Sequence, residues 1–553
     1  MATARSLLAL TLVARVSART TLSFDAAWEF ILGDEPGWAP ATCSIPYDIN
    51  VTGTRCDGLQ SLGAFATAEA CYSAACGEGL GLYQWCDAAT GCTSGTNGSC
   101  WAGSLTDCAA SNQTAAGWIS YGTNAPPTPA PFNPAPPPPP TCPGDRACAD
   151  YDDSAWRTVS TPHDYVDEGA PTPTADRNHG YLPYNFSWYR KHFNVDASWQ
   201  GQPVWLGFDG VYRASDYWLN GVWIGHWESG YAPFNMYIHN ATGATLNYGT
   251  TPNVLAVRVD GATHQEGWFY EGSGIYRSVT IETAPALNLV PWGVYAPSLV
   301  TGAISSPAGL AGPQTASGAL LSITLDVQNS GATADAYSYA VALVDATGAT
   351  VATASGAGPT LPPGGWARNS TPLTLTFANL WSVSTPYLYT LAVSLTATNA
   401  KTVDAVNVTV GVRSAIFDAN KGFLLNGLPV QIQGFSQHQD FGGLGTAVPH
   451  RVQEYRVSSV KAIGCNGWRT AHNPVNKDLL DITDRLGMLV WSENRNLERQ
   501  VIGGDRRGGV PNQVINISQF PDPQYLMEAQ QMVLRDRNHP SIIIWSLCNE
   551  GAF

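Results

Sequence analysis

The fold of the C-terminal part of the chain is decided by the stretch RNHPSIIIWSLCNE, residues 537–550. Its apolar run from Ile542 to Leu547 is typical of a strand buried on both faces, as in a parallel sheet. The run ends in an amide and a carboxylic acid, Asn549 and Glu550. In a β/α barrel, polar side chains at the carboxyl end of a strand are usually catalytic. The alternative is a buried strand followed by a solvated acid.

Residues 414–553 alternate between strand and helix patterns. A helical stripe of Val452, Tyr455 and Ile463 precedes a strand pattern at 465–470. A second helix and strand follow, and then a third helix and the apolar run described above. Such alternation predicts a β/α barrel. The patterns account for four strands where eight are required, so the sequence predicts the first half of a barrel.

Three strand-end motifs resemble glycoside hydrolase family 2, which includes β-galactosidases, β-glucuronidases and β-mannosidases. They are GFSQHQD at 434–440, WRTAHNP at 468–474 and the stretch that ends at Glu550. The resemblance implies a jelly-roll sugar-binding domain, an immunoglobulin-like sandwich and a TIM barrel. It also implies hydrolysis with retention, which needs two carboxyl groups about 5–5.5 Å apart.

The resemblance assigns a role to each candidate site residue. Glu550 is the expected acid/base, and Asn549 is expected to donate a hydrogen bond to the sugar 2-hydroxyl. Arg469 is expected to hold the nucleophile carboxylate with two hydrogen bonds. The further candidates for binding substrate are His472, His438 and Asp440. A lone histidine is more often structural, but both histidines follow a strand inside a matching motif.

The family nucleophile is a glutamate on the seventh strand, downstream of Phe553. The chain as given is therefore expected to lack its nucleophile and to be inactive. No cofactor is expected to be required. The family also implies magnesium or sodium in some members, but the segment Ser492 to Arg495 departs from that pattern, so no metal ligand is assigned.

A cysteine-rich insertion divides the first domain. Segments 22–38 and 150–165 look like two pieces of one sandwich, and ten of the twelve cysteines lie between them. An even cysteine cluster predicts a disulfide framework in an oxidising compartment. The insertion, 39–149, ends in a proline-rich tether. It faintly resembles apple-like modules that bind protein or glycan, and an inert stapled insertion is the alternative.

The predicted organisation has four parts. Residues 1–18 form a secretory signal, 19–287 the jelly roll with its insertion, 288–413 the immunoglobulin-like sandwich, and 414–553 the incomplete barrel. A secreted or endomembrane-lumen protein is therefore expected. The formal charge of −15 argues against a nucleic-acid surface, and no segment is apolar enough to span a membrane. The sequence does not indicate an oligomeric state.

The sequence favours one subtype and leaves others open. The motifs around His438 and Glu493 look most like a secreted β-galactosidase, which implies a β-linked glycan substrate. A β-glucuronidase would show proline after the acid/base, where this chain has Gly551. The alternatives are a β-glucuronidase or β-mannosidase of the same family, or a secreted glycan-binding protein without catalysis.

Overall fold

The computed structural model describes twelve ranges and single residues of the chain. Three of the ranges, 60–64, 80–85 and 99–104, are described by their backbone alone. The predicted signal at 1–18 and the acid/base candidate Glu550 lie outside the described residues. The described residues are 19–32, 60–64, 80–85, 99–104, 140, 142, 144–175, 179–239, 243–262, 270–398, 403–495 and 523–549.

Two antiparallel sheets form the first domain. One sheet has the strand order β10-β9-β12-β7-β2-β6 and the other has the order β1-β13-β8-β11. The 3-10 helix η3 (Ala197–Trp199) follows β7. The strands are β1 (Thr20–Ser23), β2 (Trp28–Leu32), β6 (Arg157–Val159), β7 (Phe186–Phe193), β8 (Val204–Phe208), β9 (Ser215–Leu219), β10 (Val222–Trp227), β11 (Phe234–Tyr237), β12 (Asn253–Asp260) and β13 (Val279–Thr283).

The two sequence pieces of this domain are joined in one sheet. Strand β2 pairs antiparallel with β6, so that Trp28 faces Val159 and Phe30 faces Arg157. The alternating burial of β2 places its aromatic residues in the sandwich core. The prediction that 22–38 and 150–165 belong together is therefore confirmed for these strands.

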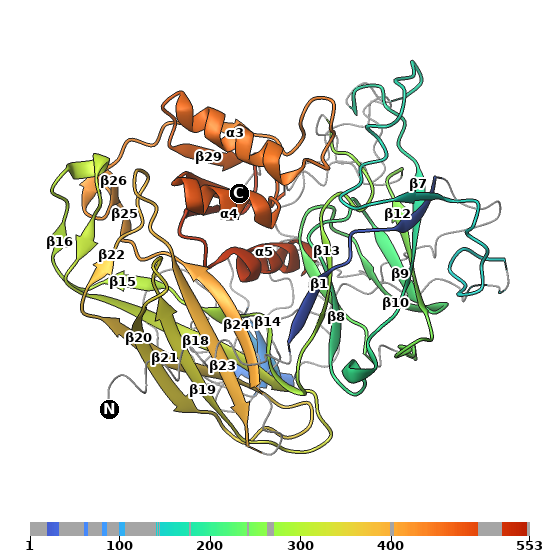
Figure 1. Cartoon of the computed structure of the whole chain (residues 1–553), viewed down its shortest axis with the longest axis horizontal. Coiled ribbons are helices and arrows are strands. Elements are labelled where there is room, and N and C mark those ends of the chain that lie inside the picture. Colours follow the sequence, from blue (N-terminus) through green and yellow to red (C-terminus); the bar gives the residue numbers. More distant parts are fainter. Residues whose placement is uncertain are drawn as a thin grey trace. The chain divides into compact units, whose positions relative to one another are not determined.

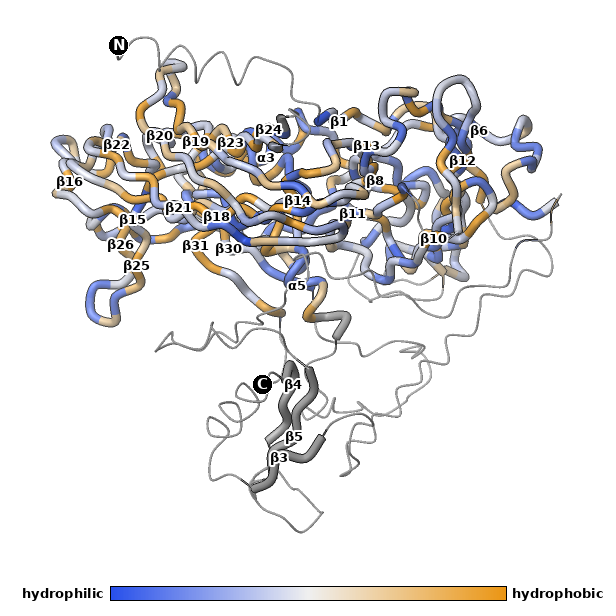
Figure 2. The backbone as a smooth tube through the Cα atoms, turned by 90° about the horizontal axis from the view of Figure 1, so that it is seen from below, coloured by the Kyte–Doolittle hydropathy of each residue, from blue (hydrophilic) through white to orange (hydrophobic). Residues whose placement is uncertain are grey.

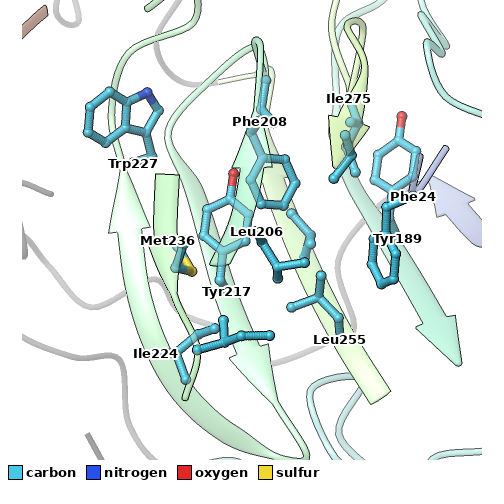
Figure 3. Close-up of a cluster of buried hydrophobic side chains, with 14 of the residues drawn as sticks. Phe24, Tyr189, Leu206, Phe208, Tyr217, Ile224, Trp227, Met236, Leu255 and Ile275 are labelled. Carbon is cyan, nitrogen blue, oxygen red and sulfur yellow. The ribbon is translucent and has the colours of Figure 1, made fainter. Parts of the chain in front are cut away.

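The core between the two sheets is built from aromatic and branched side chains. Phe208 stacks on Phe234 with ring centroids 5.0 Å apart, and Phe234 stacks on Trp227 at 4.5 Å. Figure 3 shows several of these side chains filling the space between strands. Strands β9 and β10 are joined by Asn220 and Gly221, which have φ angles of 52° and 83°. These values suit a type I′ turn, the hairpin turn that an Asn-Gly pair between two strand patterns predicts.

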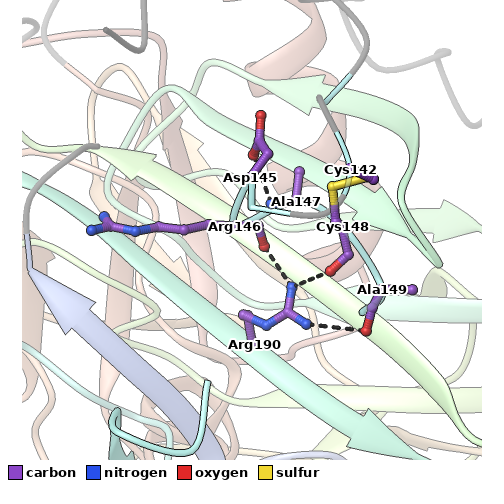
Figure 4. Close-up of a disulfide and its surroundings, with 7 residues drawn as sticks. All are labelled: Cys142, Asp145, Arg146, Ala147, Cys148, Ala149 and Arg190. Carbon is purple, nitrogen blue, oxygen red and sulfur yellow. Dashed lines mark hydrogen bonds between the residues drawn. A yellow bond between two sulfur atoms is a disulfide. The ribbon is translucent and has the colours of Figure 1, made fainter. Parts of the chain in front are cut away.

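A disulfide-closed segment covers the outer face of the six-stranded sheet. Cys142 and Cys148 are bonded, with 5.7 Å between their Cα atoms. The fully buried Arg190 of β7 donates through Nη1 to the carbonyl oxygens of Arg146 and Cys148 (Figure 4). The sequence analysis assigned this segment to the insertion at 39–149. The last residues of that insertion pack on the jelly roll, where Ala147 is buried.

The described strands of the insertion form a small sheet of their own. It is antiparallel, with the order β3-β5-β4, and it lies in the second of the two compact units of the chain. The disulfides expected between Cys43 and Cys108 fall outside what the structure describes there. The strands are β3 (Gln60–Ala64), β4 (Leu80–Trp85) and β5 (Ser99–Ser104).

The second domain is an immunoglobulin-like sandwich. Residues Leu321, Ile323, Leu325 and Val327 of β18 are all fully buried, as the alternation of apolar and polar residues along this stretch predicts. One 3-10 helix, η4 (Gly309–Ala311), lies between strands. The strands are β14 (Leu287–Tyr295), β15 (Ser298–Val300), β16 (Ile304–Ser305), β17 (Thr315–Ala316), β18 (Ala319–Asn329), β19 (Tyr337–Val344), β20 (Thr350–Ala357), β21 (Trp366–Leu375), β22 (Ala378–Asn379), β23 (Tyr389–Ala397) and β24 (Val403–Val410).

A parallel sheet with the strand order β28-β29-β30-β31 forms the third domain. Helices follow its strands in the predicted alternation (Figure 1). A hairpin precedes the sheet, and its exposed turn is hydrophilic (Figure 2). The elements are β25 (Ala415–Asp418), β26 (Gly422–Leu425), β27 (Leu428–Pro429), β28 (Gly434–Gln437), α3 (His450–Ala462), β29 (Gly467–Thr470), α4 (Lys477–Leu486), β30 (Leu489–Glu493), α5 (Pro523–Asp536) and β31 (Ile542–Ser546).

The predicted buried face of the first barrel helix is wrong, whereas the end of the second helix lies where its sequence indicates. Tyr455 and Ile463, expected on the buried stripe of the first helix, are 64% and 71% exposed. The buried residues of α3 are Gln453 and Val457 instead, because α3 is packed chiefly against α4. Helix α4 ends at Gly487, where a glycine after a helical pattern predicts the end of a helix, and Gly487 adopts the left-handed conformation of a C-cap. No described helix is long and apolar enough to cross a membrane.

Candidate active site

The carboxyl ends of the parallel strands bring the predicted motifs together. In the register of the sheet, Ser436 of β28 lies beside Arg469 of β29, and Arg469 lies beside Trp491 of β30. Side chains in register on adjacent parallel strands point to the same face. The guanidinium of Arg469 lies 5.1 Å from the Trp491 ring centroid, a cation–π contact.

Glu493, at the end of β30, organises this face. Both Nε and Nη2 of Arg469 donate to its Oε2 atom, at 3.0 and 2.7 Å. His472 Nδ1 lies 2.6 Å from its Oε1 atom. Arg469 Nη2 also donates to Asn549 Oδ1 at 2.8 Å. One buried carboxylate therefore joins three of the five predicted substrate-binding residues into one network.

The charge of Glu493 is maintained by its partners. Burial by itself raises the pKa of this carboxyl, but the hydrogen bonds with His472 and Arg469 outweigh it and lower the pKa. The side chain has no exposed surface, and its two oxygens already accept three hydrogen bonds. A nucleophile must reach the substrate, so a carboxylate without exposed surface does not fit that role. Its geometry is that of an orienting group.

The partner expected for Arg469, the nucleophile carboxylate, lies beyond the strands described in this chain. The family resemblance assigned Arg469 to the nucleophile carboxylate, whereas the described residues pair it with Glu493 and Asn549. Its side chain is 26% exposed, so one edge of the guanidinium still faces outward. The amide Nδ2 of Asn549 is buried and has no hydrogen-bond partner among the described residues. It is a donor placed one residue before Glu550.

A second group of residues lines a small pocket that both the barrel and the jelly roll border. His438 and Asp440 follow β28, and the His438 ring packs edge-on against His472 at 5.5 Å. Burial lowers the pKa of His438, although Asp440 opposes the effect. The neutral imidazole is thereby favoured near pH 7. The full lining is Tyr231, Tyr270, Glu271, His438, Gln439, Asp440, His472 and Asn473.

Two arginines fix the loop that carries His438. Arg456 of α3 donates to the carbonyl oxygens of His438 and Gln439, at 2.6 and 3.2 Å. Arg277, from the jelly roll, donates to Gln439 Oε1 at 3.0 Å and to the Pro474 carbonyl at 2.7 Å. The loop is therefore held from the helix side and from the first domain. Burial lowers the pKa of Arg456, with Asp440 opposing the effect.

Sequence reasoning found the barrel side of the site and missed the jelly-roll side. Tyr231, Tyr270 and Glu271 come from the first domain and were not among the predicted site residues. No local pattern distinguishes an aromatic residue that lines a pocket from one that fills a core. Glu493 carried a weak signal, since it follows a predicted strand, but its buried pairing is a tertiary feature.

Comparison with known proteins gives the family. The sugar binding domain of glycosyl hydrolases family 2 matches residues 152–285, a second family 2 profile matches 313–413, and the family 2 TIM barrel domain matches 417–553. The beta-galactosidase BoGH2A of Bacteroides ovatus is 33% identical over 402 residues, which cover 72% of this chain and 44% of the relative. The chain belongs to glycoside hydrolase family 2.

The chain is also similar to a second curated protein and to a solved structure. A beta-glucuronidase of Formosa agariphila is 25% identical over 425 residues, covering 71% of this chain and 39% of the relative. A solved family 2 structure from Bacteroides cellulosilyticus superposes with a TM-score of 0.61 at 29% identity, covering 73% of this chain and 50% of that one. The chain spans half or less of the length of these relatives. These relatives share the three-domain architecture with this chain.

Proposed function

We propose that the protein is a retaining, exo-acting glycoside hydrolase that removes terminal β-D-galactosyl residues. The observation that carries the proposal is the network of Arg469, His472 and Asn549 around Glu493. It lies at the carboxyl ends of barrel strands, where catalytic residues occur in this fold. Glu550 is the next residue in the chain after Asn549.

The proposed mechanism has two steps. Glu550 protonates the glycosidic oxygen while a second carboxylate attacks the anomeric carbon, so that the aglycone leaves as an alcohol. Glu550, now ionised, then takes a proton from water while the water oxygen attacks the anomeric carbon, and the bond to the second carboxylate breaks, which releases the sugar with its β configuration. The family places the second carboxylate on the seventh barrel strand, beyond the strands described in this chain. Asn549 Nδ2 donates to the 2-hydroxyl, a contact that strengthens in the transition state.

The lining of the pocket supports a neutral sugar over a uronic acid. Glu271 and Asp440 contribute two acids, and the described lining contains neither lysine nor arginine. A uronate carboxylate in a site of low dielectric needs a cationic partner, and like charges cost binding energy. This arrangement favours a galactoside over a glucuronide, although β-glucuronidases are among the relatives.

The test is the substitution Glu550→Gln in the protein with its whole catalytic domain. General acid/base help contributes about 10²–10⁴-fold. We expect kcat/KM to fall most for galactosides with poor leaving groups and least for activated aryl galactosides, which need little protonation. An equal loss across the leaving-group series would refute the role of Glu550. Tight sugar binding without turnover by the unaltered protein would favour the glycan-binding alternative.

Substrate choice is tested separately. The nitrophenyl β-galactoside, β-glucuronide and β-mannoside are compared at equal concentration, and the galactoside should give the highest kcat/KM. A higher value for the glucuronide would refute the argument from the acidic lining and leave the hydrolytic assignment intact.

A further inference from the structure

Asp164 of the jelly roll lies at the contact between the first domain and the barrel. It is 5% exposed. Its Oδ1 atom accepts the backbone N–H groups of Val166 and Ser273, at 3.1 and 3.0 Å. Its Oδ2 atom accepts the Tyr270 hydroxyl at 2.8 Å, and both the N–H and the hydroxyl of Thr446 at 2.9 Å. A single carboxylate thus accepts five hydrogen bonds from two domains.

Two glycines leave room for this carboxylate. A Cβ atom on Gly445 would lie 2.3 Å from Asp164 Oδ2, and one on Gly272 would lie 2.5 Å from it. Both glycines have positive φ angles, 56° and 69°, which side chains rarely adopt. The Gly445 position would also place a Cβ atom 2.8 Å from the Tyr270 hydroxyl. The backbone of both domains is therefore shaped around the Asp164–Tyr270 contact.

Both partners of Asp164 Oδ2 belong to the candidate active site or its support. Tyr270 lines the same pocket as His438, Asp440 and His472. Thr446 ends the turn that begins directly after Asp440, a turn closed by hydrogen bonds between Phe441 and the residues at 444–445. Building on the proposed function, we propose that Asp164 is a positioning residue: it sets the place of Tyr270 and of the Asp440 loop against each other.

The chemistry of the five donors makes an aspartate specific here. Three of the five are backbone N–H groups, which cannot become acceptors, and two are hydroxyls, which can. In Asp164→Asn the amide would keep its oxygen toward Val166 and Ser273 and turn its NH2 group toward Thr446. The hydroxyls can then accept, but the Thr446 N–H would face another donor. The loss is therefore confined to the barrel loop, which gives the proposal a local readout.

Asp153 gives a matched control. It lies in the same domain and accepts from Arg190 Nε at 2.7 Å and pairs with His192 at 2.8 Å, but on the outer face of the six-stranded sheet. Asp153→Asn should disturb the jelly roll without reaching the barrel loop. A general loss of stability would affect both variants alike.

The first test is hydrogen–deuterium exchange of the 553-residue chain. In Asp164→Asn the amide of Thr446 should exchange about tenfold faster or more, the factor expected for about 1.4 kcal/mol, while strands β7 and β12 keep their protection. In Asp153→Asn the Thr446 amide should be unchanged. Unchanged Thr446 exchange in Asp164→Asn, or equal loosening by both variants, would overturn the proposal. This readout does not depend on any enzyme activity.

The second test uses aryl β-galactoside kinetics in the protein with its whole catalytic domain. Asp164→Asn should raise KM about tenfold while kcat changes less than about threefold, because the sugar is held less well and the acid/base is untouched. Gly445→Ala, which alters the barrel side of the contact, should likewise raise KM with little change in kcat. In the double variant the combined loss of kcat/KM should be smaller than the sum of the two single effects in free energy. An equally large loss of kcat with an unchanged KM would contradict a positioning role for Asp164. Absence of activity in the unaltered protein, together with the exchange result, would refute the proposed function alone.

Discussion

Replacing Glu493 with glutamine changes the centre of the candidate site by a single atom. The carboxylate is fully buried and has Arg469 on one oxygen and His472 on the other. Glutamine keeps one acceptor oxygen and puts an NH2 group in place of the second. His472 can accept a hydrogen bond from this NH2 group through an unprotonated Nδ1, whereas Arg469 has only donors. The substitution therefore leaves Arg469 without its counter-charge.

The expected cost follows from the burial of the pair. Removing one partner of a buried ion pair costs about 3–5 kcal/mol. The Arg469 side chain is 26% exposed, so water compensates part of its charge, and an amide oxygen turned toward Arg469 still accepts from Nε and Nη2. We expect Glu493→Gln to destabilise the barrel region by about 2 kcal/mol. The pKa of Glu493 is lowered in the fold, so its contribution is present above the ordinary glutamate value of 4.5 and is lost as pH falls through the lowered pKa.

The assay is hydrogen exchange of β29 and β30 in the 553-residue chain, at pH 7 and at decreasing pH. The control is Glu454→Gln, which breaks the exposed pair with Arg485 and should cost less than about 0.5 kcal/mol. The difference between wild type and Glu493→Gln should shrink as the carboxyl becomes protonated. A Glu493→Gln effect no larger than that of the control would refute the claim that this carboxylate organises the site.

Two further predictions concern the first domain. Burial would lower the pKa of His226, but Asp216 and Glu228 outweigh burial and raise it to about 9; its stabilisation is therefore full below pH 6.5 and lost as pH rises through 9. His226→Gln should flatten the fall of the urea midpoint over that window, and an unchanged fall would contradict the pairing. Deleting residues 42–128 should leave the yield of folded protein and the thermal midpoint of the rest nearly unchanged, whereas deleting 42–148 should lower both, because it removes the disulfide-closed cover of the six-stranded sheet. Equal effects of the two deletions would contradict that role.

Local patterns in the sequence predicted the elements that depend on local physics. The alternation from Leu321 to Val327 marks a half-buried strand, and Asn220-Gly221 marks a tight hairpin, because each depends on residues adjacent in the chain. The split of the first domain could also be predicted, since β2 and β6 each keep their strand pattern on either side of a long insertion. The three strand-end motifs of the barrel were found because strand ends in this fold carry polar residues.

The features that the sequence did not predict depend on tertiary contacts. Tyr455 and Ile463 fit a helical stripe, but the face of α3 that is buried depends on where α4 packs. Tyr270 looks like any other sandwich aromatic until Asp164 and Thr446 are placed beside it. Arg469 was expected at the nucleophile carboxylate, and its pairing with Glu493 was not predicted because it depends on the register of β29 and β30.

The most direct test of the central claim is azide rescue of Glu550→Ala in the protein with its whole catalytic domain. If Glu550 is the acid/base of a retaining mechanism, the variant still forms the glycosyl-enzyme from an activated aryl β-galactoside, and azide then attacks it without general-base help. Turnover should rise with azide concentration, and proton NMR should identify β-galactosyl azide as the product. No rescue, or a product of α configuration, would contradict the assignment of Glu550.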